Sequence, residues 1–335
     1  MTTHLVPLLD IQNLKTYFDT ADGEVRAVQG VSLTIASSET VGLVGESGCG
    51  KSVTAFSILR LLPPRIGRIV EGQINFRRRN GEIVDLAKTD PRGDVIRSIR
   101  GDEIAMIVQE PMTSPSPVHT IGSQIMEAVE LHQGVSSVEA RKRTIHVLEQ
   151  VGIANPEQRI YEYPHQFSGG MRQRAMIAMA LACNPSLLIA DEPTTALDVT
   201  IQAQILELMK ALQAEFDMAI MIITHNLGVV AELADRVVVM YMGKVVESGS
   251  ARTIYHNPLH PYTLGLMQSV PRMGRDVKRR LVPIPGCVPD PFSIPKGCAF
   301  FPRCAAPKKA ACSGPEDVPL LETEPGHQVR CTQYS

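Results

Sequence analysis

The sequence lacks the features that would direct attention to a membrane or to nucleic acid. No uncharged apolar run reaches the roughly 18 residues that a membrane-spanning helix needs, because Asn184-Pro185 divides the longest candidate, Met176 to Ala190. The start shows no charged segment followed by an apolar one, so we expect no signal peptide. The net charge is only −2 and no long basic tract stands out, which argues against a nucleic-acid surface. We therefore expect a cytoplasmic protein, which can still dock onto a membrane partner.

The length and the pattern of the chain predict two domains. Its 335 residues leave room for about two, and strands alternate with helices from Thr40 to Ala234, which is typical of an α/β domain with a largely parallel sheet. The stretch from Ile121 to Val151 is predicted to be helical and polar. Hairpins predicted after Asp22-Gly23 and around Gly243 indicate an added antiparallel β layer. After Pro258, proline and cysteine become frequent, which predicts a separate, loop-rich C-terminal unit.

A glycine-rich loop predicts a nucleoside triphosphate site. Residues Gly45 to Ser52 match G-x-x-x-x-G-K-[ST] and lie between a predicted strand and a predicted helix. The glycines allow turns that other residues resist, and the N–H groups of such a loop wrap phosphates. Lys51 is expected to reach the β- and γ-phosphates, and Ser52 to ligate Mg²⁺. The alternative, a chance glycine-rich turn, does not explain the strand and the helix on either side.

Polar side chains follow three further predicted strands. The apolar strand that ends at Ala190 delivers Asp191 and Glu192 to the edge where ligands bind in open α/β sheets. Asp191 is predicted to hold Mg²⁺, mainly through water, and Glu192 to polarise the attacking water. Gln109 could sense the γ-phosphate or the metal, and a neutral imidazole at His225 could hydrogen-bond the γ-phosphate. Taken alone, Gln109 and His225 are better explained as structural polar residues at strand ends, so the wider pattern must decide.

A second anion site is predicted at Ser168-Gly169-Gly170-Met171-Arg172-Gln173. A serine and two adjacent glycines that open a helix aim free N–H groups and the helix dipole at negative charge. One nucleotide does not need two such cradles from one chain. Two copies that face each other could use both, so the pattern predicts a nucleotide shared between chains.

Five of the seven cysteines follow Gly286. In a cytoplasmic chain, clustered cysteines indicate a metal sooner than disulfides. The spacings among Cys298, Cys304, Cys312 and Cys331 are 5, 7 and 18 residues, unlike the paired C-x₂-C of a common zinc ribbon. Four thiolates would suit a [4Fe–4S] cluster or zinc, and unliganded thiols in a loop-rich tail are the alternative. Cys287 lies outside this pattern.

Taken together, the motifs resemble the ATP-binding subunit of an ABC transporter over about residues 8 to 256. The resemblance implies a P-loop ABC-type nucleotide-binding domain at residues 1–256, with a parallel sheet core, an antiparallel β layer and a helical subdomain at about 110–182. Residues 257–335 would form the small C-terminal domain. The matching segments are the Walker A loop at Gly45 to Ser52, the Q-loop at Gln109, the signature at Ser168 to Gln173, the Walker B carboxylates Asp191-Glu192, the D-loop at Ala196-Leu197-Asp198 and the H-loop at His225.

The resemblance also implies a mechanism in which two cassettes sandwich two ATP molecules head to tail. Each site takes the phosphate loop of one subunit and the signature of the other, and Asp198 communicates across the dimer. Phe18 fits best as the aromatic residue stacked on adenine, with Tyr17 as its neighbour. The implied positions are Glu192, His225, Gln109 and Lys51 for catalysis, Ser52, Gln109 and Asp191 for Mg²⁺, and Phe18, Gly45, Ser47, Gly48, Cys49, Gly50, Lys51, Ser52, Val53, Ser168, Gly169, Gly170 and Asp198 for ATP.

Finer features are similar to the ATPases of oligopeptide and dipeptide importers: Asn257 to Thr263, Ile284-Pro285-Gly286 and the cysteine-bearing tail. That subfamily implies a second ATPase subunit, usually a different chain, two integral-membrane permease subunits that dock near Gln109, and an extracytoplasmic substrate-binding protein. It places the chain at the cytoplasmic face of the inner membrane and implies iron–sulfur at the four cysteines. One departure, Thr113 to Val118, lies close to the expected permease contact.

Two alternatives stay open from the sequence. The same subfamily includes importers of nickel, opines and oligosaccharides, and the ATPase does not touch the cargo. A soluble ABC ATPase that acts on DNA or ribosomes is disfavoured, because the chain has one compact cassette without long insertions.

Overall fold

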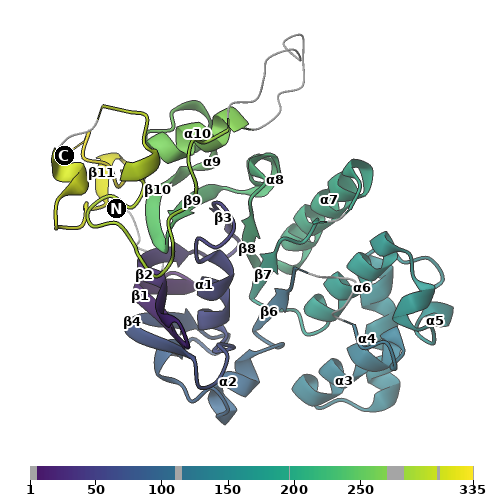
Figure 1. Ribbon diagram of the computed structural model, residues 1–335. Helices are drawn as coiled ribbons and strands as arrows, with labels where there is room; N and C mark the ends of the chain where they lie inside the picture. Colours follow the sequence, from purple (N-terminus) through teal and green to yellow (C-terminus); the bar gives the residue numbers. More distant parts are fainter. Residues whose placement is uncertain (1–5, 110–114, 196, 270–282, 308–309, 335) are drawn as a thin grey trace, which may run out of the picture.

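The computed structural model describes residues 6–109, 115–195, 197–269, 283–307 and 310–334. Two sheets and the helix α1 (Lys51–Ile58) form one lobe, and α3 to α6 form another (Figure 1). Ala55 and Ile58 of α1 share a hydrophobic core with Leu9 of one sheet and Val41 of the other, so α1 is packed between the sheets. The part of Thr113 to Val118 before Pro115 lies outside the described residues.

The main sheet has eight strands in the order β11-β12-β10-β9-β3-β8-β7-β6. Strands β6, β7, β8, β3 and β9 are parallel, so their carboxyl ends meet at one edge. This confirms the predicted parallel core. The strands are β3 (Thr40–Val44), β6 (Ile104–Ile107), β7 (Leu187–Asp191), β8 (Ala219–Thr224), β9 (Arg236–Tyr241), β10 (Lys244–Ser250), β11 (Leu321–Glu324) and β12 (His327–Val329).

The second sheet is antiparallel, in the order β2-β1-β4-β5, and supplies the predicted β layer. Its strands are β1 (Leu9–Thr20), β2 (Gly23–Ile35), β4 (Gly67–Arg77) and β5 (Ile83–Asp85). The assignment of the hairpin around Gly243 to this layer was wrong. Its strand β9 pairs in parallel with β3, from Val41 opposite Arg236 to Val44 opposite Val239, so the hairpin extends the main sheet.

The stretch predicted as helical from Ile121 to Val151 contains two helices. Gly134 ends the first in the left-handed conformation with φ 61°, and the side chain of Ser136 caps the next by accepting from the N–H of Glu139. The helices expected after the phosphate loop and at Ser168 are present, whereas those at 94–99, 156–159, 251–256 and 261–269 were not predicted. The helices are α2 (Asp94–Ile99), α3 (Ile121–Gln133), α4 (Ser137–Gln150), α5 (Pro156–Arg159), α6 (Gly169–Leu181), α7 (Val199–Phe216), α8 (Leu227–Leu233), α9 (Ala251–His256) and α10 (Pro261–Ser269).

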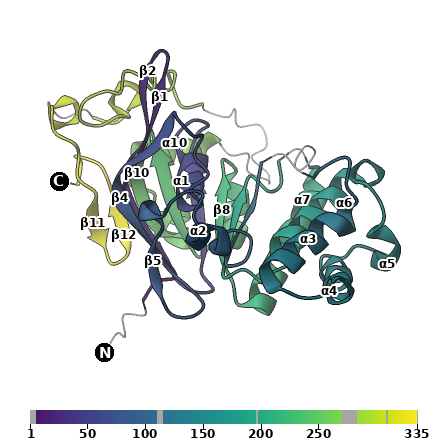
Figure 2. The same cartoon turned by 90° about the horizontal axis from the view of Figure 1, so that it is seen from below.

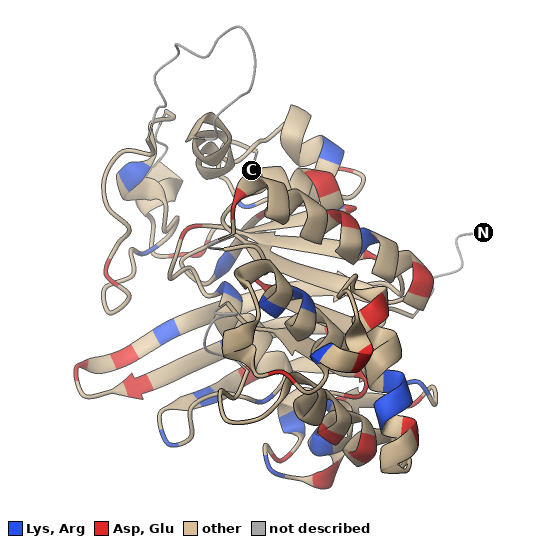
Figure 3. Cartoon of the chain, turned by 90° about the vertical axis from the view of Figure 1, so that its right-hand side faces the viewer, with Lys and Arg blue, Asp and Glu red and all other residues tan. Residues whose placement is uncertain are grey.

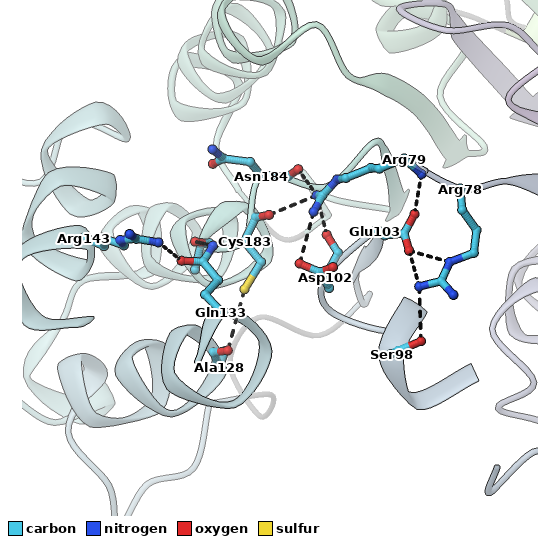
Figure 4. A network of polar contacts seen from close by, with 11 residues as sticks. Arg78, Arg79, Ser98, Asp102, Glu103, Ala128, Gln133, Arg143, Cys183 and Asn184 are labelled. Atoms are coloured by element: carbon cyan, nitrogen blue, oxygen red, sulfur yellow. Dashed lines mark hydrogen bonds and ion pairs between the residues drawn. The ribbon is translucent and has the colours of Figure 1, made fainter. Parts of the chain in front are cut away.

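An arginine joins the β layer to the helical lobe (Figure 4). Arg79, in the turn between β4 and β5, donates from Nη2 to the carbonyl oxygens of Asp102 at 2.8 Å, Cys183 at 3.0 Å and Asn184. The last two carbonyls follow α6, whose C-terminal C=O groups have no partner within the helix. Arg79 also donates from its backbone N–H to the buried carboxylate of Glu103 at 2.8 Å. The C-terminus of α6 is therefore held by a residue from the other lobe.

The C-terminal segment attaches to the edge of the main sheet. Strand β12 pairs with β10, and β11 pairs with β12. The fully buried Glu247 of β10 accepts from the N–H groups of Leu259 at 2.7 Å and His260 at 3.0 Å, and from Nε2 of His327 at 2.8 Å. Figure 2 shows this segment, in yellow, on the side of the molecule opposite the α3–α6 lobe. One buried carboxylate thus ties the tail to the sheet.

Candidate nucleotide site

The predicted phosphate loop connects β3 to α1, and two of its glycines have no room for a side chain. Gly50 precedes α1 with φ 99°, and a Cβ there would lie 2.3 Å from the carbonyl oxygen of Ala27. Gly45 has φ 156°, and a Cβ there would lie 2.3 Å from the carbonyl oxygen of Met240. Only glycine adopts these conformations without strain, so the loop keeps its shape by excluding side chains.

Lys51 begins α1 and is nearly buried, with 6% of the residue exposed. Its Nζ donates to the carbonyl oxygens of Gly45 at 2.8 Å and Glu46 at 3.0 Å. The ammonium is therefore enclosed by the loop, at the end of a helix whose N-terminus favours anions. Burial raises the pKa of the Cys49 thiol beside it, which keeps the sulfur protonated and unreactive.

Ser52 and Asp191 lie together beside the phosphate loop. Asp191 ends β7 and is 3% exposed, and its carboxylate accepts a hydrogen bond from Ser52. Burial raises the pKa of Asp191, the hydrogen bond from Ser52 opposes this shift, and the nearby Glu192 adds to it. A hydroxyl and a buried carboxylate in contact are the oxygen ligands that Mg²⁺ prefers. The donor set therefore fits the predicted metal.

Glu192 lies at the centre of a cluster at the carboxyl edge of the sheet. Its Oε1 lies 2.9 Å from Nδ1 of His225, which follows β8. Its Oε2 accepts from Nε2 of Gln109, which follows β6, at 3.0 Å, and from the hydroxyl of Thr195 at 2.9 Å. Three adjacent strands, β6, β7 and β8, thus bring together three residues that the sequence predicted. Thr195 was not predicted to be part of this group.

The partners of Glu192 also set its charge. Burial alone would raise the pKa of Glu192, but the hydrogen bonds from His225 and Thr195 outweigh it, and the pKa is lowered. Because its pKa is lowered, the carboxylate is ionised. With 13% of its side chain exposed, it still reaches solvent at the sheet edge. A fixed, ionised carboxylate at this position can accept a hydrogen bond from a water molecule and orient it.

The two aromatic candidates for adenine stacking lie on opposite faces of β1. The hydroxyl of Thr16 hydrogen-bonds the hydroxyl of Ser57 in α1 at 2.8 Å, and side chains two apart on a strand share a face. Phe18 therefore faces the side of α1, where its ring packs against Gly67. Tyr17 faces away and lies under the guanidinium of Arg26, 5.6 Å from its ring centroid. The stacking of Phe18 on adenine stays a prediction.

The signature and the D-loop each place an exposed polar residue, Ser168 and Asp198, at the start of a helix. Ser168 caps α6 by accepting from the N–H of Met171 at 3.3 Å, and a Cβ on Gly169 would meet no atom within 4 Å. Asp198 caps α7 by accepting from the N–H of Ile201 at 2.9 Å, and Val199 is 79% exposed. Helix α6 lies in the helical lobe, apart from the lobe of α1 (Figure 1). Ala196 lies outside the described residues.

The four C-terminal cysteines of the predicted cluster line one pocket together with His260 and Phe300. Burial raises the pKa of Cys298, and the other three sulfurs raise it further. None of the four forms a disulfide, and Cys287 is exposed and away from this lining. Within the described ranges, no group of three or more His, Cys, Asp or Glu side chains converges closely enough to hold a metal ion. The predicted residues are thus neighbours without ligand geometry.

The sequence did not reveal one contact of the phosphate loop. The carboxylate of Glu46 pairs with Arg303, and its N–H donates to the hydroxyl of Tyr262 at 2.7 Å. These partners follow the loop by more than 200 residues, and their local sequence carries no signal that pairs them with it.

Comparison with known proteins agrees with the motifs. The ABC transporter family matches residues 28–195, and the family of C-terminal regions of oligopeptide/dipeptide transporters matches residues 246–312. The oligopeptide transport ATP-binding protein AppD of Bacillus subtilis is 49% identical over 327 residues, which cover 98% of this chain and 97% of that protein. The dipeptide transport ATP-binding protein DppD of the same organism is 52% identical over 297 residues, which cover 89% and 86%.

Solved structures give the same picture. The dimeric ATP-binding cassette in a post-hydrolysis state, bound to ADP and Pi, is 27% identical with a TM-score of 0.63, and the match covers 73% of this chain and 99% of that one. The cbiO1 subunit from Clostridium perfringens is 25% identical with a TM-score of 0.61, and the match covers 75% and 91%. In the described part of the chain, no helix is long and apolar enough to span a membrane. The chain is an ABC-type ATPase and belongs to the family of ATP-binding subunits of oligopeptide and dipeptide ABC transporters.

Proposed function

We propose that the chain hydrolyses ATP to power the import of dipeptides and oligopeptides, and that closure of two cassettes around ATP drives the transporter. The observation that carries the proposal is the carboxylate of Glu192, held between Gln109 and His225 beside Asp191 and Ser52. The names of relatives at about 50% identity over nearly the whole chain support the class of cargo.

Each residue of the site has a role in this proposal. The N–H groups of the loop from Gly45 to Val53, and Lys51, bind the phosphates, and Phe18 stacks on adenine. Ser52, Gln109 and Asp191 hold Mg²⁺, which neutralises charge on the phosphates when bound. Glu192 orients the attacking water. His225 contacts Glu192 and hydrogen-bonds the γ-phosphate, which fixes the two relative to each other.

The second half of each site comes from another chain. Ser168 is exposed and Gly169 and Gly170 are partly exposed at the start of α6, so their N–H groups can meet the γ-phosphate of an ATP bound to the partner. Asp198 lies at the exposed start of α7, where it reaches the other cassette. We propose that this partner is a second ATPase subunit, usually a different chain. The two integral-membrane permease subunits dock near Gln109 on the cytoplasmic face of the membrane, and an extracytoplasmic protein delivers the substrate.

The proposed division of the chain is a cassette at residues 1–256, with its helical subdomain at about 110–182, and a C-terminal domain at 257–335. Matches to two separate families, at 28–195 and 246–312, support this division. The pairing of β12 with β10 supports a C-terminal domain that is fastened to the cassette.

For the C-terminal domain we propose a [4Fe–4S] cluster on Cys298, Cys304, Cys312 and Cys331, with zinc as the alternative. Four thiol donors that line one pocket are the observation in favour. Metal analysis of anaerobically purified protein tests it: each of the four Cys→Ser substitutions should lose the metal, and Cys287→Ser should keep it. Stoichiometric zinc would replace the iron proposal, and metal-free wild-type protein would refute both.

Reconstitution tests the transport proposal. The chain, its partner ATPase, the permeases and the binding protein are assembled in vesicles, and uptake of labelled peptide is followed with and without ATP. ATP-dependent peptide uptake that Glu192→Gln abolishes is the expected result. Transport of nickel, an opine or an oligosaccharide in place of peptide would change the cargo but not the ATPase, whereas copurification with ribosomes or DNA would contradict the role in transport.

A further inference from the structure

The phosphate loop and the cysteine-bearing segment, residues 287–331, are joined by a partly buried ion pair. Nη1 of Arg303 lies 2.6 Å from Oε2 of Glu46, and Nη2 lies 3.0 Å from Oε1. The side chain of Arg303 is 4% exposed and that of Glu46 is 28% exposed. Two parallel hydrogen bonds between a guanidinium and a carboxylate fix orientation as well as distance, so Glu46 is held in one position.

Other contacts lock Arg303 in place. Its Nε donates to the carbonyl oxygen of Pro285 at 3.1 Å, and Nη1 lies 3.4 Å from the hydroxyl of Tyr241. The guanidinium lies 5.8 Å from the ring centroid of Tyr241 and 5.9 Å from that of Phe300. Arginine is suited to such a position because its planar group pairs and stacks at once. The pair is therefore anchored on the C-terminal side.

A tyrosine from α10 holds the backbone of Glu46. The fully buried Tyr262 accepts the N–H of Glu46 at 2.7 Å, and its ring packs on Tyr241 with centroids 4.7 Å apart. The carbonyl oxygen of Glu46 in turn accepts from Nζ of Lys51. The side chain, the N–H and the C=O of Glu46 are thus all engaged, and a short chain of contacts leads from Arg303 and Tyr262 to the lysine that meets the phosphates.

Arg303 also lies between two cysteines of the cysteine-bearing segment, Cys298 and Cys304. It closes the short 3₁₀ helix Phe301–Arg303, and Cys304 follows it directly. The N–H of Phe301 donates to the carbonyl oxygen of Cys298 at 2.9 Å, and the N–H of Cys298 donates to that of Cys312 at 2.9 Å. The backbone that positions Arg303 is therefore the backbone that positions three of the four cysteines.

We propose that Arg303 is a positioning residue for the ATP site, and that the C-terminal domain supports the phosphate loop through Arg303 of its cysteine-bearing segment and Tyr262 of α10. A loop that binds phosphates with backbone N–H groups must be preorganised, because each misplaced N–H loses a charge-assisted hydrogen bond. This inference rests on ATP binding by the loop and is independent of the metal that the cysteines hold.

The test measures the affinity of the full-length chain for Mg·ATP in variants of the pair. Arg303→Ala and Glu46→Gln should each raise the Kd for ATP by roughly tenfold or more. Losses of this size are typical when a residue that positions a binding residue is removed. The double variant should be no weaker than the worse single one, because the two residues act as one unit. Arg303→Lys, which keeps the charge but not the fork, should recover part of the affinity. Lys51→Ala removes a direct phosphate contact and reports separately whether the loop is the ATP site.

Arg330→Ala is the matched control. Arg330 lies in the same segment and donates from Nε to the carbonyl oxygen of Val245 at 2.8 Å and from Nη1 to that of Val318 at 2.6 Å, away from the loop. It should lower the melting temperature without changing the Kd for ATP. In the assembled transporter, Arg303→Ala should raise KM for ATP more than it lowers kcat.

Two results would overturn the inference. One is a wild-type ATP affinity in Glu46→Gln and in Arg303→Ala, whatever happens to their stability. The other is an equal loss of affinity in Arg330→Ala, which would mean that general loosening of the segment, not the ion pair, changes the site. If Arg303→Ala fails to fold, Glu46→Gln and Arg303→Lys decide the question.

Discussion

The cassette and the C-terminal segment are held together by different interactions. The sheets and helices of the cassette share two large apolar cores, in which residues such as Ile189 and Ile220 are almost fully buried. The C-terminal segment shares a third, smaller apolar core with the cassette, in which Phe300 packs against Tyr241 and Tyr262. It is also fastened by buried charges, chiefly Glu247 and Arg303. An apolar core tolerates small shifts, whereas a buried charge is stable only with its partners in place. We therefore expect the folding of the C-terminal segment to depend on a few charged contacts, and the folding of the cassette not to.

The largest effect on stability should come from removing the buried carboxylate of Glu247, which holds the C-terminal segment to the main sheet. Glu247→Ala leaves His327 and the N–H groups of Leu259 and His260 without their acceptor, and should cost about 3–5 kcal/mol, as for a broken buried pair. Limited proteolysis should then release the segment after α10 while the cassette resists. Glu247→Gln, which keeps an acceptor, is the control and should be milder. Simultaneous unfolding of both regions in Glu247→Ala would show that the comparison is false.

Chemistry in the cassette should be separable from its stability. Glu192→Gln removes the charge that orients water but keeps the size of the side chain, so turnover should fall by at least roughly 10²-fold with ATP binding retained. The closed dimer should be trapped. Glu207→Gln, an exposed carboxylate on α7, is the control and should hydrolyse ATP normally. Near-normal hydrolysis by Glu192→Gln in the assembled transporter would remove Glu192 from its role.

A smaller effect is expected at the joint between the two lobes of the cassette. Arg79→Ala frees three backbone carbonyls near the end of α6 and should destabilise the protein by about 1–3 kcal/mol. Arg26→Ala removes a more exposed arginine from an ion pair with Glu24 and from the ring of Tyr17, and should cost no more than about 1 kcal/mol. Chemical denaturation measures both. Equal midpoints for the two variants would contradict a structural role for Arg79.

Charge on the surface does not distinguish the two regions. In the view of Figure 3, basic and acidic residues are interspersed along the helices, in keeping with the net charge of −2. The difference between cassette and tail therefore lies in what each buries, and variants of exposed charges should leave it unchanged.

The same difference explains what could be predicted from the sequence. Local patterns were sufficient for the cassette: the loop at Gly45 to Ser52 lies between its strand and helix, and Gln109, Glu192 and His225 meet because parallel strands end at one edge. The break at Gly134 was missed because its flanks are both helical in pattern. Strand β12 and the pair between Glu46 and Arg303 were missed because each depends on contacts between residues far apart in the chain.

We propose that a second chain completes the ATP site, because Ser168 is exposed and the two glycines after it are partly exposed at the start of α6. The most direct measurement is the rate of ATP hydrolysis per chain, from a strictly monomeric dilution to the assembled transporter, for wild type and Ser168→Arg. Wild-type monomer should bind ATP and hydrolyse it poorly, and activity should rise on assembly. Ser168→Arg should bind ATP normally but block closure. Full activity in the strictly monomeric state would contradict the shared site.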